Sequence, residues 1–147
     1  MFSPQVNQEL KKCKIFEGTF ARDNIPQADR RPIAFIINTD SVNEPGEHWV
    51  ALYLCCDETA IYFDPFGLPP MHKDFTNFIK QNSPRGLLYS SLSLQNMFST
   101  LCGWYCIEFV KAMNKKLSLR EFLNQFKRCT LCNDVQLKRK LNIPDNE

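Results

Sequence analysis

The sequence lacks the features that carry a chain into or across a membrane. Its first residues, MFSPQVNQELKKCK, contain no basic stretch followed by an apolar one, which a secretion signal requires. No apolar run reaches the roughly 20 residues that a transmembrane helix needs. Net charge is nearly balanced at +2, so composition alone demands neither nucleic acid nor a membrane surface as a partner. We therefore expect an intracellular location and no membrane partner.

Full internal disulfide pairing is also excluded, because the chain has seven cysteines, an odd number. Without a secretion signal, this favours a reducing compartment, where thiols act as core residues, metal ligands or nucleophiles. A length of 147 residues, 44% of them hydrophobic, suffices for one buried core and is short for two domains. No repeat, low-complexity tract or linker divides the chain, so we expect one compact domain over residues 1–147.

Apolar runs bounded by turn residues predict strands in four places. These are Ile33–Asn38, His48–Cys56, Ala60–Phe66 and Leu87–Leu94. The short connection between the second and third runs predicts a hairpin. The stretch Glu17–Pro32 is rich in turn formers, which predicts an ordered loop.

Helical patterns occur in segments beginning near Pro4, Lys73, Cys102, Ser118 and Asn133. The segment CGWYCIEFVKAM is the most apolar, with only a thin polar stripe, so we expect it inside the domain. Ser118 has the spacing of a capping box, and Asn133 is a candidate cap for the last helix. The predicted class is α+β, with a mostly antiparallel central sheet packed on a buried helix that begins at Cys102.

Three residues on these predicted strands and helices have the chemistry that a thiol protease needs. Cys102 begins the buried helix, where the positive end of the helix dipole lowers the pKa of a thiol. His48 begins a strand, and an imidazole beside such a cysteine can form a thiolate–imidazolium pair. Asp64 ends the neighbouring apolar run, from which a carboxylate can hold the imidazole tautomer.

Strand register decides whether Asp64 can reach His48. Pairing Ala60 with Cys56 would leave the two functional residues about 13 Å apart along the strands, too far for a hydrogen bond. Pairing Ala60 with Leu54 instead makes them diagonal neighbours about 7 Å apart between backbones. We therefore predict a five-residue connection over 55–59, a bulge or a strong twist.

Several motifs resemble those of adenain, the adenovirus endopeptidase, and of the wider superfamily of SUMO-specific proteases. They are His48-Trp49, YFDPFG (62–67) and QNMFSTLCG (95–103), with a seven-residue step from Gln95 to Cys102. GTFARD (18–23) and FIINTD (35–40) are closer to adenain. Asp64 departs from the Glu that is typical of adenain and matches the SUMO-protease side, and either carboxylate can orient a histidine.

The resemblance implies a papain-like, adenain-like fold and a role for each motif residue. His48 is implied as general base, Asp64 as its orienting carboxylate and Cys102 as nucleophile. Gln95 is implied as oxyanion-hole donor beside the Cys102 N–H, a sensible pair for a developing oxyanion. Trp49 and Gly103 are implied to flank the substrate cleft.

The implied activity is that of a viral or mobile-element endopeptidase, which cleaves structural precursor proteins at glycine-containing sites in the host nucleus or the virion. We expect a monomer that needs no cofactor and binds DNA weakly. Stimulation by DNA or by an activating peptide is carried over from adenain. Residues 84–94 contain no cysteine, so we do not expect a disulfide-linked activator.

Two alternatives belong to other functional classes. One is a processing or deconjugating protease for ubiquitin-like tails that end in Gly-Gly. The other is a zinc-binding interaction module without catalysis, because Cys129-x-x-Cys132 is a metal half-site. Its further ligands would come from Cys55, Cys56, Cys106 and His72.

Overall fold

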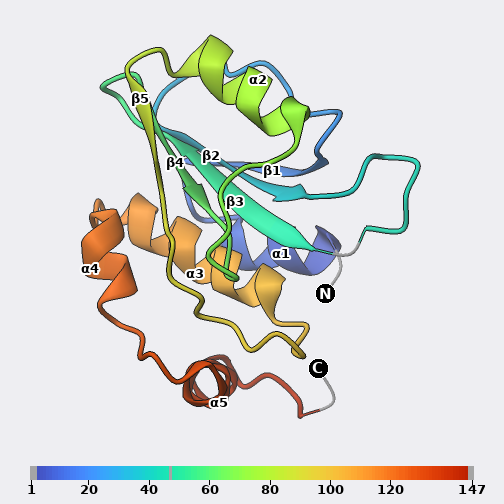
Figure 1. Cartoon of the computed structure of the whole chain (residues 1–147), viewed down its shortest axis with the longest axis vertical. Coiled ribbons are helices and arrows are strands. Elements are labelled where there is room, and N and C mark those ends of the chain that lie inside the picture. Colours follow the sequence, from blue (N-terminus) through green and yellow to red (C-terminus); the bar gives the residue numbers. More distant parts are fainter. Residues whose placement is uncertain (1–2, 47, 146–147) are drawn as a thin grey trace.

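A five-stranded sheet forms the centre of the computed structural model, which describes residues 3–46 and 48–145 (Figure 1). Its strands lie side by side in sequence order: β1 (Phe16–Ala21), β2 (Ile33–Asn38), β3 (Trp49–Leu54), β4 (Thr59–Phe63) and β5 (Gly86–Tyr89). The central strands β2, β3 and β4 are antiparallel, as expected. The two edge strands run parallel to their neighbours.

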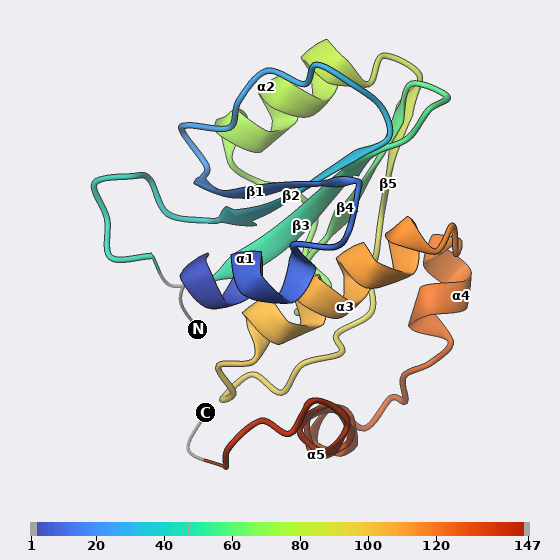
Figure 2. The same cartoon turned by 180° about the vertical axis from the view of Figure 1, so that it is seen from behind.

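Helices cover both faces of this sheet (Figures 1 and 2). On one face lies α2 (Lys73–Asn82). The opposite side holds α1 (Ser3–Leu10), α3 (Cys102–Asn114), α4 (Leu119–Leu123) and α5 (Thr130–Leu141). This arrangement is the α+β class that the sequence predicts. No helix among residues 3–46 and 48–145 is long and apolar enough to cross a bilayer.

The unbroken apolar run of β2 follows from this layering, because both faces of the strand are buried. Ala34 and Ile36 belong to the core beneath α3, whereas Ile33, Phe35 and Ile37 belong to the core beneath α2. Each core therefore receives alternate residues of one strand.

Helix α3 lies in the larger core, with ten of its thirteen residues buried. Its polar stripe meets charged side chains of other helices. Glu108 pairs with Lys140 of α5 at 3.0 Å, and Lys111 pairs with Glu9 of α1 at 3.6 Å. The first residue of α3, Cys102, lines the same cleft as His48, which precedes β3, and Phe66, which follows β4.

Several expected boundaries were wrong. The stretch 17–32 is not all loop, because it contains most of β1. The pairing of β1 with β2 is irregular at Gly18, where φ is +150°. The strand was not predicted because this stretch is rich in residues typical of turns. The fourth predicted strand ends at Tyr89. Asn133 does not cap α5, since Cys129 does; Asn133 lies inside the helix. The capping box at Ser118 is confirmed.

Candidate active site

The register of β3 and β4 brings His48, which precedes β3, close to Asp64, which follows β4. Leu54 pairs with Ala60, and the Cys55 N–H donates to the Thr59 carbonyl at 2.8 Å. The register predicted from the sequence is confirmed. His48 Nε2 lies 2.8 Å from Asp64 Oδ1, within hydrogen-bond distance.

The turn after β4 holds the carboxylate in place. Asp64 is only 4% exposed, and its Oδ1 also accepts from the Phe66 N–H at 2.8 Å. The Gly67 N–H closes the turn by donating to the Asp64 carbonyl. Phe66 stacks on the His48 ring, with centroids 4.7 Å apart and an interplanar angle of 18°. The turn over residues 64–67 therefore orients the carboxylate of Asp64 toward His48 and fixes the plane of the imidazole.

Gly67 is required at this turn for two reasons. Its φ of +77° is a conformation that favours glycine. A Cβ there would also lie 2.7 Å from the carbonyl carbon of Leu92, a backbone atom that cannot rotate away. The turn consequently packs tightly on the segment that leads to Gln95.

Cys102 is the first residue of α3, and it lines the same cleft as His48. Burial alone would raise the pKa of Cys102, but the hydrogen bond and charge of His48 outweigh it and lower the pKa. Burial alone would lower the pKa of His48, but hydrogen bonds to Asp64 and Cys102 raise it to about 9. Both shifts favour a thiolate beside an imidazolium. Because Nε2 faces Asp64, Nδ1 is the ring nitrogen left for the thiol.

Gln95 is held beside this pair by its backbone. The N–H groups of Leu94 and Gln95 both donate to the Pro65 carbonyl, at 2.8 and 3.1 Å. The side chain is 1% exposed, and its Nε2 donates to the Ser99 carbonyl at 2.9 Å. Its Oε1 has no hydrogen-bond partner among the described residues. An amide nitrogen carries two hydrogens, so one donor remains for a ligand.

An open cleft of about 390 Å³ runs over these groups. It is lined by Gly46, His48, Trp49, Phe66, Gln95, Ser99, Thr100 and Cys102. Of the two residues expected to contact substrate, Trp49 lines the cleft, whereas Gly103 is buried and is not among the lining residues. Sequence reasoning missed Phe66, although it stands in the DPFG motif next to Asp64.

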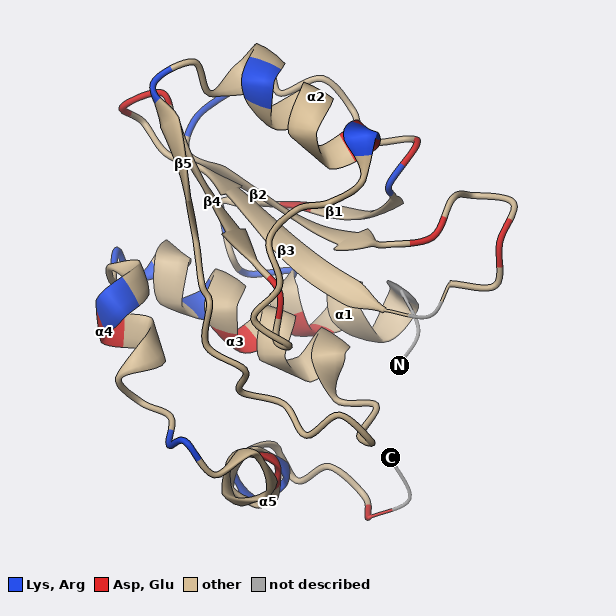
Figure 3. Ribbon diagram, in the orientation of Figure 1, with Lys and Arg blue, Asp and Glu red and all other residues tan. Residues whose placement is uncertain are grey.

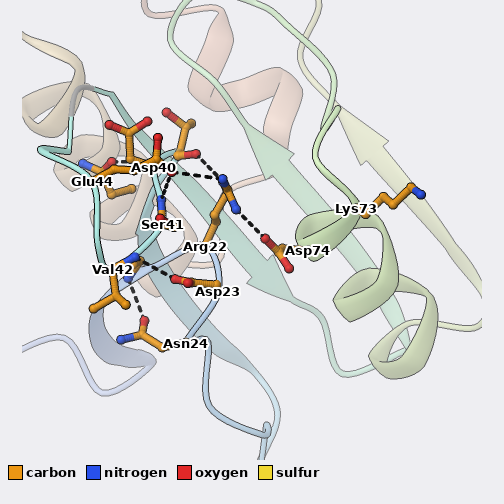
Figure 4. A network of polar contacts seen from close by, with 12 residues as sticks. Arg22, Asp23, Asn24, Asp40, Ser41, Val42, Glu44, Lys73 and Asp74 are labelled. Carbon is orange, nitrogen blue, oxygen red and sulfur yellow. Dashed lines mark hydrogen bonds and ion pairs between the residues drawn. The ribbon is translucent and has the colours of Figure 1, made fainter.

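A second cavity, of about 510 Å³, adjoins this cleft and shares Gly46 and Trp49 with it. Its outer wall is the loop that follows β2, which Arg22 holds in place (Figure 4). The guanidinium of Arg22 contacts Asp74 of α2 at 2.7 Å and Glu44 of the loop at 3.1 Å. The second cavity therefore extends the open space from Trp49 toward β1 and the loop that follows β2.

The other cysteines do not form a metal centre. Cys129 and Cys132 are joined as a disulfide at the start of α5. Within the described part of the chain, no group of three or more His, Cys, Asp or Glu side chains is placed to hold a metal ion. Cys106 is fully buried, which raises the pKa of its thiol. The arrangement therefore gives the zinc-binding alternative no support.

The fold is similar to that of the ASFV pS273R protease. A crystal structure of that protease matches with a TM-score of 0.60 and 17% identity over 89% of this chain. Its selenomethionine form matches with a TM-score of 0.59 and 18% identity over 85% of this chain. The chain spans 61% and 60% of the lengths of those two structures. No protein-family model matches the sequence, and no curated protein matches it either.

Proposed function

We propose that the chain is a cysteine endopeptidase with Cys102 as nucleophile, His48 as general base and Asp64 as orienting carboxylate. The observation that carries this proposal is the imidazole of His48, which is hydrogen-bonded to Asp64 and lines the same cleft as the Cys102 thiol. The opposite pKa shifts of the thiol and the imidazole favour the ion pair that activates a cysteine. The fold shared with a protease supports the same reaction class.

The proposed chemistry is acyl transfer. The thiolate attacks the scissile carbonyl carbon, and the carbonyl oxygen takes up the negative charge. His48 gives its proton to the leaving amine, and the acyl group remains on Cys102 as a thioester. The neutral imidazole then takes a proton from water, whose oxygen attacks the thioester and releases the acid. Asp64 keeps Nε2 protonated, so that Nδ1 carries out both proton transfers.

Two donors are available for the oxyanion in this scheme. The second hydrogen of Gln95 Nε2 is one, because only the first is used by the Ser99 carbonyl. The Cys102 N–H is the other, since amides in the first turn of a helix have no intrahelical acceptor. Both groups border the cleft that holds the thiol.

For the substrate, we propose glycine-containing sites in structural precursors of a virus or mobile element, processed in the virion or the host nucleus. The adenain-like motifs DPFG and QNMFSTLCG support this specificity. Trp49 and Phe66 are the two large aromatic residues that line the cleft beside Cys102. Hydrolysis of ubiquitin-like Gly-Gly tails is the second candidate, which rests on the same resemblance.

A panel of substrates tests the proposal. Purified protein is incubated with Gly-X peptides, Gly-Gly peptides and ubiquitin-like conjugates, and products are identified by mass spectrometry. We expect cleavage after glycine in extended peptides, and we expect none with Cys102→Ala. Faster turnover of ubiquitin-like conjugates than of short peptides would favour the second candidate. Absence of cleavage across the panel would contradict the proposal.

We also propose that DNA binds weakly to the C-terminal part of the monomer and stimulates cleavage. Residues 111–140 carry nine Lys or Arg and two Asp or Glu, whereas the rest of the sequence carries nine and fourteen. Figure 3 shows these cations on α4, on α5 and on the segment between them. Such a distribution suits a phosphate backbone despite the small net charge. Salt-sensitive retardation of a duplex oligonucleotide, with faster cleavage in its presence, is the expected result.

A further inference from the structure

Helix α5 buries two polar side chains on the side that faces the loop carrying Gln95. Asn133 is 1% exposed and Asp134 is 7% exposed, although the residues on either side of this pair, Cys132 and Val135, are exposed. A buried amide or carboxylate is costly unless its hydrogen bonds are satisfied. Both side chains direct their hydrogen bonds away from α5, to other elements.

These bonds hold the backbone on both sides of Gln95. Asn133 Nδ2 donates to the Leu94 carbonyl at 3.1 Å. Asp134 Oδ2 accepts from the Asn96 N–H at 3.3 Å. The residues that precede and follow Gln95 are thus both anchored to one turn of α5.

Asp134 also connects this anchor to the helix that carries the nucleophile. Its other oxygen, Oδ1, accepts from the Tyr105 hydroxyl at 2.6 Å. Tyr105 is fully buried and lies one turn along α3 from Cys102. Burial and the bond to Asp134 both raise the pKa of Tyr105, so it remains a hydrogen-bond donor at neutral pH. One carboxylate therefore fixes the Gln95 segment relative to the start of α3.

The side chain of Gln95 has little else to fix it on this side. Its amide makes one described hydrogen bond, to Ser99 of its own loop, and its Oε1 has no partner among the described residues. The position of the amide consequently depends on the backbone at 94–96. That backbone is held by the Pro65 carbonyl from the sheet side and by α5 from the other side.

We infer that Asn133 and Asp134 are positioning residues, which keep the Gln95 amide aimed at the site of the developing oxyanion. This inference rests on the proposed function, because it assigns Gln95 the oxyanion role. Displacement of a catalytic group by about 1 Å can cost on the order of 100-fold in rate. Loss of an oxyanion donor costs roughly 100- to 1,000-fold in kcat. Weakening the anchor is therefore expected to lower kcat and to leave KM unchanged.

The test is a double-mutant cycle between Asp134→Asn and Gln95→Ala. An asparagine in place of Asp134 would keep the volume and an acceptor for Tyr105, but it weakens the bond to the Asn96 N–H. We expect about a 10-fold loss of kcat, at constant KM, in the wild-type background. We expect no further loss once Gln95 is replaced by alanine, because the amide to be positioned is gone.

Two controls separate this role from a general loss of structure. Gln136→Ala, an exposed position on the same helix, should leave kcat unchanged. The rate of alkylation of Cys102 by iodoacetamide, followed by mass spectrometry, should be the same in Asp134→Asn, since the ion pair with His48 is untouched. A fully additive cycle, or a parallel fall of alkylation and kcat, would overturn the positioning role alone. A wild-type protein that cleaves no peptide would overturn the proposed function as well.

Discussion

Replacing Asp64 by asparagine should change the pH dependence of cleavage more than its maximum. In the wild type, activity requires the thiolate–imidazolium pair. The pair forms as pH rises through the lowered pKa of Cys102, and it is lost as pH rises through about 9, where His48 gives up its proton. Asparagine keeps an acceptor for the Phe66 N–H but removes the negative charge beside Nε2.

The size of the effect follows from the pKa of His48. The rise from 6.5 to about 9 is a stabilisation of the imidazolium on the order of 3 kcal/mol. Without the carboxylate charge, only Cys102 still opposes the burial of the ring, which lowers the pKa of His48. If the pKa returns to 6.5, the protonated fraction at pH 8 falls from about 90% to about 3%, roughly 30-fold, whereas at pH 6 it falls by only about a quarter.

The assay is kcat/KM for a glycine-containing peptide from pH 5 to pH 10, for the wild type and for Asp64→Asn. We expect the alkaline limb to move to lower pH by more than one unit and the acidic side of the profile to change little. Asp29→Asn, at an exposed position, is the matched control and should retain the wild-type profile. An alkaline limb that stays near 9, or an equal loss at pH 6 and pH 8, would refute the reasoning.

Four further variants test other parts of the site and fold. Gln95→Ala should lower kcat by roughly 100- to 1,000-fold with little change in KM, and an equal rise of KM would argue against an oxyanion role. Gly67→Ala should lower the free energy of unfolding by at least about 2 kcal/mol, since strain and a clash with Leu92 add. Gly86→Ala has strain but no close neighbour, so urea denaturation should show a smaller loss. Arg31→Met removes three hydrogen bonds from a guanidinium to the backbone carbonyls of Cys55, Asn82 and Thr59, and should cost about 3 kcal/mol in the same measurement. Stability equal to wild type would contradict that.

Secondary structure could be predicted most accurately where full burial makes a segment of the sequence almost entirely apolar. Ile33–Asn38 is a strand with both faces covered, and its bounds could be predicted because an apolar run ends at turn residues on both sides. Cys102–Asn114 was similarly clear, since a nearly all-apolar helix belongs in the core. The contact of His48 with Asp64 could be predicted in part, because pairing Leu54 with Ala60 brings the two residues closer than pairing Cys56 with Ala60, and the structure has the former register.

What could not be predicted depends on contacts between distant segments. β1 is a half-exposed edge strand with a glycine irregularity, so neither alternation nor an apolar run marks it. The stacking of Phe66 on His48 requires the turn geometry, which a single sequence does not reveal. Asn133 is a residue type that favours caps, yet its side chain hydrogen-bonds the backbone of Lys127 and the carbonyl of Leu94, thirty-nine positions away.

The most direct test of the central claim is covalent labelling of the nucleophile. A peptide ending in glycine that carries an electrophile in place of the scissile bond is incubated with the protein, and the adduct is mapped by mass spectrometry. We predict one adduct, on Cys102, that vanishes in Cys102→Ala together with peptide cleavage and persists in Cys106→Ala, whose thiol is buried and has a raised pKa. Labelling of another cysteine, or cleavage that survives in Cys102→Ala, would contradict the account.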